Sequence, residues 1–137
     1  MPSPFKVCYY YFMDQKILVV EDDLFLRELY TDVLGAEGYK VEGAVDGEDA
    51  LKKMKLGGYS LVLLDIIMPK MDGLTVMKQL QSTPALAPNK CVIFLTNLDK
   101  DEEIRTAMQL GNGYLIKSQI TPGSLVEEVK KYLDKYK

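Results

Sequence analysis

Residues 61–65 read Leu-Val-Leu-Leu-Asp, four apolar side chains in a row with a carboxylate directly after them. Comparable apolar runs occur at residues 17–20, 91–95 and 114–116, and a weaker one lies near Val41. Continuous apolar runs, in contrast to alternating ones, are typical of strands buried on both faces of a parallel sheet. The sequence therefore predicts five short strands in one sheet.

The segments between these runs have the periodicity of helices. The clearest one predicts an amphipathic helix that ends at Gly38, because apolar side chains fill the i, i+3, i+4, i+7 and i+8 positions: Leu26, Leu29, Tyr30, Val33 and Leu34. Later helix starts are marked by Asp46, Asp99 and Thr121, residue types that cap helices, and Pro122 follows Thr121.

Alternating strands and helices predict an α/β architecture. The best fit is a doubly wound, five-stranded parallel sheet of flavodoxin-like order 2-1-3-4-5, with helices on both faces. In such a sheet the ligand site lies beyond the carboxyl ends of the strands. The residues that directly follow each apolar run are therefore the candidate functional residues.

Composition narrows the possible functions. The chain has 137 residues, enough for one domain, and its net charge of −3 gives no basic surface for nucleic acid. It has no histidine, which excludes Ser/His and Cys/His catalysis and the usual zinc sites. No apolar run is long enough to cross a membrane, and the two cysteines have neither metal-ligand spacing nor a secretory signal. We expect a cytoplasmic protein with residues 1–15 as a loosely ordered extension and residues 16–137 as the domain.

Acidic residues follow two of the predicted strands. Glu21, Asp22 and Asp23 come after the first, and Asp65 follows the third. These strands are neighbours in the order 2-1-3, so the carboxylates should converge in one crevice, where a cation would relieve their repulsion. Oxygen ligands of this kind suit Mg²⁺. Each acid taken singly could equally be a helix cap.

The remaining strand ends add complementary chemistry. Thr96 follows the fourth apolar run and Lys117 the fifth. A hydroxyl donor and a fixed cation beside a metal are what the transfer of a phosphoryl group requires.

These residues lie in segments that resemble the receiver domains of two-component response regulators. The resemblance rests on four segments: Val19-Val20-Glu21-Asp22-Asp23, residues 64–73 (Leu-Asp-Ile-Ile-Met-Pro-Lys-Met-Asp-Gly), Leu95-Thr96-Asn97, and Gly113-Tyr114-Leu115-Ile116-Lys117. It implies a protein that takes a phosphoryl group from a sensor histidine kinase or phosphotransfer protein and signals to a downstream protein. The histidine must come from the partner, and no catalytic or DNA-binding output domain is expected.

The resemblance also implies a role for individual residues. Asp65 corresponds to the phosphoacceptor, Glu21 and Asp22 to the acidic pair, and the Ile67 carbonyl to a further Mg²⁺ ligand, whereas Asp23 falls where a helix cap is expected. Thr96 corresponds to the switch hydroxyl and Lys117 to the lysine that pairs with the phosphoryl group. Tyr114 falls at the position of the switch aromatic, although a tyrosine on a strand can be a plain packing residue.

One position departs from the family pattern. Ser118 follows Lys117, where the family usually has a proline in a cis bond. Because a cis bond before a residue other than proline costs about 3 kcal/mol, we expect a trans Lys117-Ser118 bond.

Three other functions share this fold or a strand-end aspartate. A haloacid dehalogenase type of phosphatase needs an aspartate two residues after the nucleophile, where this chain has Ile67, and an FMN binder needs a Ser/Thr/Gly-rich loop where this chain has three acids. The alternative that stays open is a receiver-fold scaffold that binds a partner independently of phosphorylation.

Overall fold

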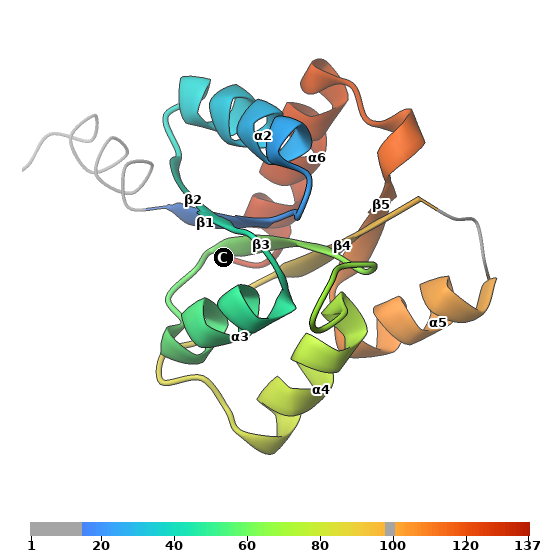
Figure 1. Ribbon diagram of the computed structural model, residues 1–137. Coiled ribbons are helices and arrows are strands. Elements are labelled where there is room, and N and C mark those ends of the chain that lie inside the picture. Colours follow the sequence, from blue (N-terminus) through green and yellow to red (C-terminus); the bar gives the residue numbers. More distant parts are fainter. Residues whose placement is uncertain (1–14, 98–100) are drawn as a thin grey trace, which may run out of the picture.

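A five-stranded parallel sheet forms the centre of the structure (Figure 1), a computed structural model that describes residues 15–97 and 101–137. The strands are β1 (Lys16–Val20), β2 (Lys40–Ala44), β3 (Leu61–Asp65), β4 (Val92–Thr96) and β5 (Gly113–Ile116). Their order is β2-β1-β3-β4-β5, and every neighbouring pair is parallel. The predicted order is therefore confirmed.

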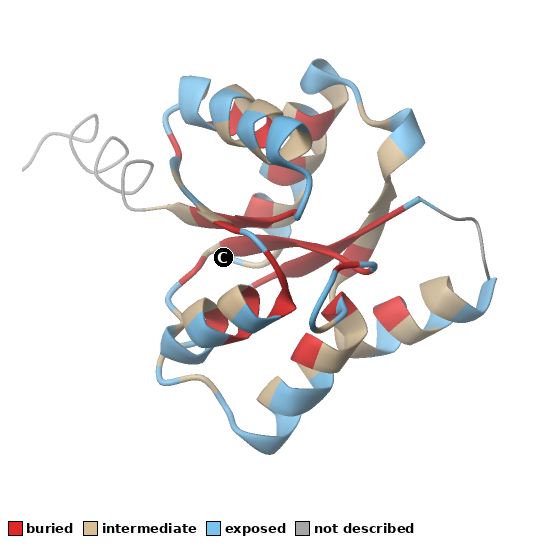
Figure 2. Cartoon of the chain, viewed as in Figure 1, coloured by how far each residue is buried: buried red, intermediate tan, exposed pale blue. Residues whose placement is uncertain are grey.

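Helices cover both faces of this sheet. The core on one face includes side chains of α2 (Leu24–Ala36) and α6 (Pro122–Lys135), whereas the core on the other includes side chains of α3 (Gly47–Leu56), α4 (Gly73–Ser82) and α5 (Asp101–Leu110). A short 3₁₀ turn, η1 (Lys117–Gln119), links β5 to α6. Figure 2 shows that the buried residues concentrate along the central strands. β3 and β4 are buried at every position, which explains why their sequences do not alternate.

The helix boundaries agree with most of the sequence signals. The Asp46 side chain accepts a hydrogen bond from the Asp49 amide at 2.8 Å, and Thr121 forms a capping box with Ser124, with Pro122 in the first turn. α2 ends at Ala36, two residues before the predicted end, and Gly38 has a left-handed φ of 96° where the chain turns toward β2. The cap predicted at Asp99 lies outside the described residues.

Three further expectations concern the chain as a whole. The predicted boundary between residues 1–15 and 16–137 falls at the first residue of β1, while residues 1–14 lie outside the described part of the chain. Cys91 is a buried free thiol. Among the described residues, the helices are too short or too polar to cross a membrane.

Candidate functional site

A cleft of about 500 Å³ opens at the carboxyl edge of the sheet. It is lined by residues that follow β1, β3, β4 and β5, which in a parallel sheet all end at this edge. The lining includes Glu21, Asp22, Asp23, Asp65, Ile67 and Lys117. The structure thus brings together most of the residues that the sequence had marked as candidates.

Three carboxylates form the centre of the cleft. Glu21, directly after β1, is 1% exposed, and Asp65, the last residue of β3, is 3% exposed, whereas Asp22 faces solvent. One carboxylate oxygen from each of the three lies within 4.8 Å of the others. Their convergence confirms the placement expected from the order of the strands.

Lys117 connects the two buried carboxylates. Its Nζ lies 2.5 Å from Glu21 Oε2 and donates a hydrogen bond to Asp65 Oδ2 at 2.7 Å. The lysine side chain is only 9% exposed. It comes from the end of β5, which is separated from the Asp65 strand by β4. The Lys117 ammonium group therefore pairs with both buried carboxylates.

Burial of two carboxylates beside one lysine changes the pKa values of all three groups. Burial, together with the charge of Asp65, raises the pKa of Glu21 to about 7 against the opposing effect of Lys117. Burial also raises the pKa of Asp65, although Lys117 opposes it. Burial alone would lower the pKa of Lys117, but its two carboxylate partners outweigh burial and raise it. The lysine is thus firmly protonated, but its single positive charge does not fully offset the burial of the two acids.

This donor set fits a hard divalent cation. Glu21 Oε2 is buried, and the contact with Lys117 Nζ is the one that the described residues are seen to give it. Three carboxylates face one lysine, and oxygen ligands from two or three acids are what Mg²⁺ requires. Glu21, Asp22 and Asp65 could therefore hold Mg²⁺, and Ile67, two residues after Asp65, lines the same cleft.

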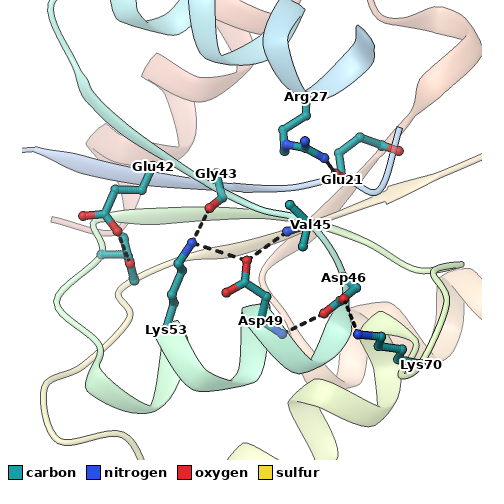
Figure 3. Close-up of polar contacts among 10 residues, drawn as sticks. Glu21, Arg27, Glu42, Gly43, Val45, Asp46, Asp49, Lys53 and Lys70 are labelled. Carbon is teal, nitrogen blue, oxygen red and sulfur yellow. Dashed lines mark hydrogen bonds and ion pairs between the residues drawn. The ribbon is translucent and has the colours of Figure 1, made fainter. Parts of the chain in front are cut away.

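The turn between β1 and α2 is held by backbone and side-chain contacts. Asp23 accepts a hydrogen bond from the Leu26 amide at 3.0 Å, which confirms that it caps α2. The Asp23 amide donates to Glu21 Oε1 at 3.2 Å. Arg27, which the sequence reasoning missed, donates from Nη1 to the Glu21 carbonyl at 2.8 Å (Figure 3). A cation in the second turn of the helix after the acidic pair was the signal that could have identified it.

The two expected switch residues lie on one face of the sheet. Thr96, at the end of β4, is 3% exposed. Tyr114 pairs with Phe94 in the sheet and packs partly buried against the core beneath α3, α4 and α5. Because side chains alternate along a strand, Thr96 is on the same face as Phe94 and Tyr114.

The link between β5 and α6 takes the expected backbone form. The described residues include no cis peptide bond, so Lys117-Ser118 is trans, as predicted. Lys117 is also the first residue of η1, which carries the chain out of the cleft toward α6.

Known proteins resemble this chain in sequence. A family model described as "Response regulator receiver domain" matches residues 17–130. The chemotaxis protein CheY of Treponema pallidum is 37% identical over 106 residues, which cover 74% of this chain and 72% of that protein. The alkaline phosphatase synthesis transcriptional regulatory protein PhoP of Bacillus subtilis is 34% identical, over 88% of this chain and 49% of PhoP. A gliding motility regulatory protein of Myxococcus xanthus is 34% identical over 85% of this chain, but the match spans only 15% of that longer protein.

Solved structures agree with the sequence comparison. A CheY-like receiver domain protein from Methanospirillum hungatei superposes with a TM-score of 0.79 at 28% identity, covering 89% of this chain and 95% of that one. A Francisella response regulator receiver domain gives a TM-score of 0.78 at 26% identity, over 90% and 99% of the two chains. With the strand order and the acidic cleft described above, these matches show that the chain belongs to the response regulator receiver domain family.

Proposed function

We propose that this domain accepts a phosphoryl group on Asp65 from a phosphohistidine of a partner and signals through the change of shape that follows. The observation that carries the proposal is the environment of Asp65, which is buried at the end of β3 and bonded to Lys117 beside the Glu21–Asp22 pair. A carboxylate placed next to a lysine and a cation site is equipped to receive a phosphoryl group.

In the proposed transfer, Asp65, Mg²⁺ and Lys117 each have a separate role. A carboxylate oxygen of Asp65 attacks phosphorus, the new O–P bond forms, and the P–N bond to the partner's imidazole breaks. Mg²⁺, held by Glu21, Asp22, Asp65 and the Ile67 carbonyl, would supply positive charge to the phosphoryl oxygens. Lys117 keeps its proton and pairs with the same group, and its raised pKa supports that role.

Signalling follows from the state of the cleft. Thr96 moves toward the phosphoryl group, space opens for Tyr114, and the face formed by α5, β5 and α6 is reshaped. This is a shift between two packings with the phosphoryl group as the biasing ligand. The proposed partners are a histidine kinase or phosphotransfer protein and a downstream protein in the cytoplasm, without nucleic acid or a membrane.

Phosphorylation is tested with acetyl phosphate and Mg²⁺, followed by intact mass. Wild type should gain one phosphoryl group, and Asp65→Asn should gain none although it keeps its circular dichroism spectrum. Asp134→Asn, a change at an exposed aspartate on α6, is the matched control and should behave as wild type. Wild type that never gains mass under several conditions would favour a scaffold that works without phosphorylation.

The metal site is tested by calorimetric titration of Mg²⁺. Glu21→Gln combined with Asp22→Asn should weaken binding strongly, because two of the three carboxylates are lost. Glu127→Gln changes an exposed acid on α6 and should have no effect. Equal affinities for the two proteins would remove the pair from the site.

A further inference from the structure

Arg27 ties α2 to the end of β1. Its Nη1 donates a hydrogen bond of 2.8 Å to the Glu21 carbonyl (Figure 3). The Arg27 backbone amide donates to the Asp23 carbonyl at 2.9 Å. Arg27 therefore holds the β1–α2 turn by both its side chain and its backbone. This turn carries the Glu21–Asp22 acidic pair.

The Glu21 carbonyl is a sensitive point of that turn. β1 ends at Val20, and the Glu21 amide still pairs with the Ala44 carbonyl at 3.2 Å, but the Glu21 carbonyl belongs to the peptide group that joins the two acids. The plane of this peptide group sets the direction in which both side chains leave the backbone. A hydrogen bond from a charged guanidinium holds that plane more strongly than a neutral donor would.

Gly43 opens the path by which Arg27 reaches the carbonyl. A Cβ atom at Gly43 would lie 3.3 Å from Arg27 Cδ, closer than an ordinary contact. Gly43 is not among the residues with positive φ, so its backbone does not require glycine, and a glycine within a strand weakens the strand. A glycine at position 43 leaves room for the Arg27 side chain, which lies beside it. The Gly43 carbonyl accepts a hydrogen bond from Nζ of Lys53, a residue of α3, at 2.5 Å.

We infer that Arg27 is a positioning residue for the Mg²⁺ site, acting through the Glu21 carbonyl, and that Gly43 keeps its path open. The inference rests on the proposed function, because it takes the acidic pair as metal ligands. Positioning and charge predict opposite outcomes. If Arg27 mattered only as a nearby cation, its removal would strengthen the binding of a second cation, whereas loss of positioning weakens it.

The first test titrates Mg²⁺ into wild type, Arg27→Ala and Arg27→Lys. Arg27→Ala should weaken binding about 10-fold or more, in line with other residues that orient metal ligands. Arg27→Lys keeps a donor and the charge and should recover part of the affinity. Arg105→Ala removes the same charge from an exposed position on α5 and should bind as wild type does.

A substitution at Gly43 tests whether the Arg27 side chain needs the space beside this glycine, and it leaves Arg27 itself unchanged. Gly43→Val raises strand propensity but crowds Arg27 Cδ, so it should weaken Mg²⁺ binding while the fold persists. If both changes act through one contact, the double variant Arg27→Ala with Gly43→Val should bind no more weakly than Arg27→Ala. Additive losses would overturn the inference that Gly43 acts through Arg27.

Hydrogen exchange in metal-free protein separates this inference from the proposed function. Amides of residues 21–23 should exchange faster in Arg27→Ala than in wild type or Arg105→Ala. Unchanged exchange, or Mg²⁺ affinity equal to or tighter than that of wild type, would overturn the role of Arg27. Wild type that fails to bind Mg²⁺ would overturn the proposed metal site, and faster exchange in Arg27→Ala would then still support the contact that holds the turn.

Discussion

Glu21 should make the metal-free protein less stable as pH rises. Its ordinary pKa is 4.5 and burial raises the folded value to about 7, so between these values the folded state binds more protons than the unfolded state. A state that binds more protons loses stability as protons are removed, and the free energy of unfolding must therefore fall between about pH 4.5 and pH 7. The difference between the two pKa values corresponds to at most about 3 kcal/mol.

The perturbation is Glu21→Gln, which keeps the shape of the side chain without its charge. In the presence of EDTA, wild type should lose up to about 3 kcal/mol of unfolding free energy between pH 5 and pH 8, and the variant should lose much less. Asp65, whose pKa is also raised, acts in the same direction and accounts for a remaining slope. Asp46 and Glu42 have lowered pKa values and act mainly below this window.

Urea unfolding followed by circular dichroism measures the effect. Glu127→Gln is the matched control, because it removes an exposed carboxylate, and it should keep the wild-type slope. Mg²⁺ should restore stability at pH 8 to wild type more than to Glu21→Gln, because the cation binds the ionised carboxylate. A wild-type stability that is flat or rises from pH 5 to pH 8, or a variant with the same slope, would refute the reasoning.

Three further outcomes are expected. Asp65→Asn should raise the melting temperature of the metal-free protein modestly, because it removes a charge from a crowded acidic cleft; a clear drop in a thermal melt would mean that Asp65 is structural. The phosphorylated form should decay slowly, because Ile67, exposed at the cleft, and Leu98, outside the described residues, cannot hold the attacking water. Decay in vitro as fast as in the Ile67→Asn, Leu98→Glu double variant would contradict this. Gly73→Ala should destabilise by about 1–3 kcal/mol, because the added Cβ would lie 2.3 Å from the Asp65 carbonyl oxygen. Gly35→Ala, with nothing within 4 Å, is the control and should be neutral or stabilising in urea unfolding.

The strand order and the position of the cleft could be predicted from the sequence. Unbroken apolar runs such as residues 61–64 require burial on both faces, and short connections with right-handed crossovers leave few arrangements of five parallel strands. Each strand end then lies at one edge of the sheet, so the acids after β1 and β3 had to meet. The caps at Asp23, Asp46 and Thr121 were predictable for a similar reason, because a cap depends only on residues one turn away.

Only the tertiary structure decided how the neighbouring acids differ. Glu21 and Asp22 are adjacent in sequence, yet Glu21 is 1% exposed and Asp22 faces solvent. The Glu21 carboxylate pairs with Lys117, which comes from the end of β5. The path of Arg27 beside Gly43 was equally hidden, since nothing in the sequence joins a glycine on an edge strand to an arginine 16 residues before it. Local patterns determine which elements form and how they begin, whereas the charge balance of a buried site is a sum over distant side chains that only the folded chain brings within a few ångströms.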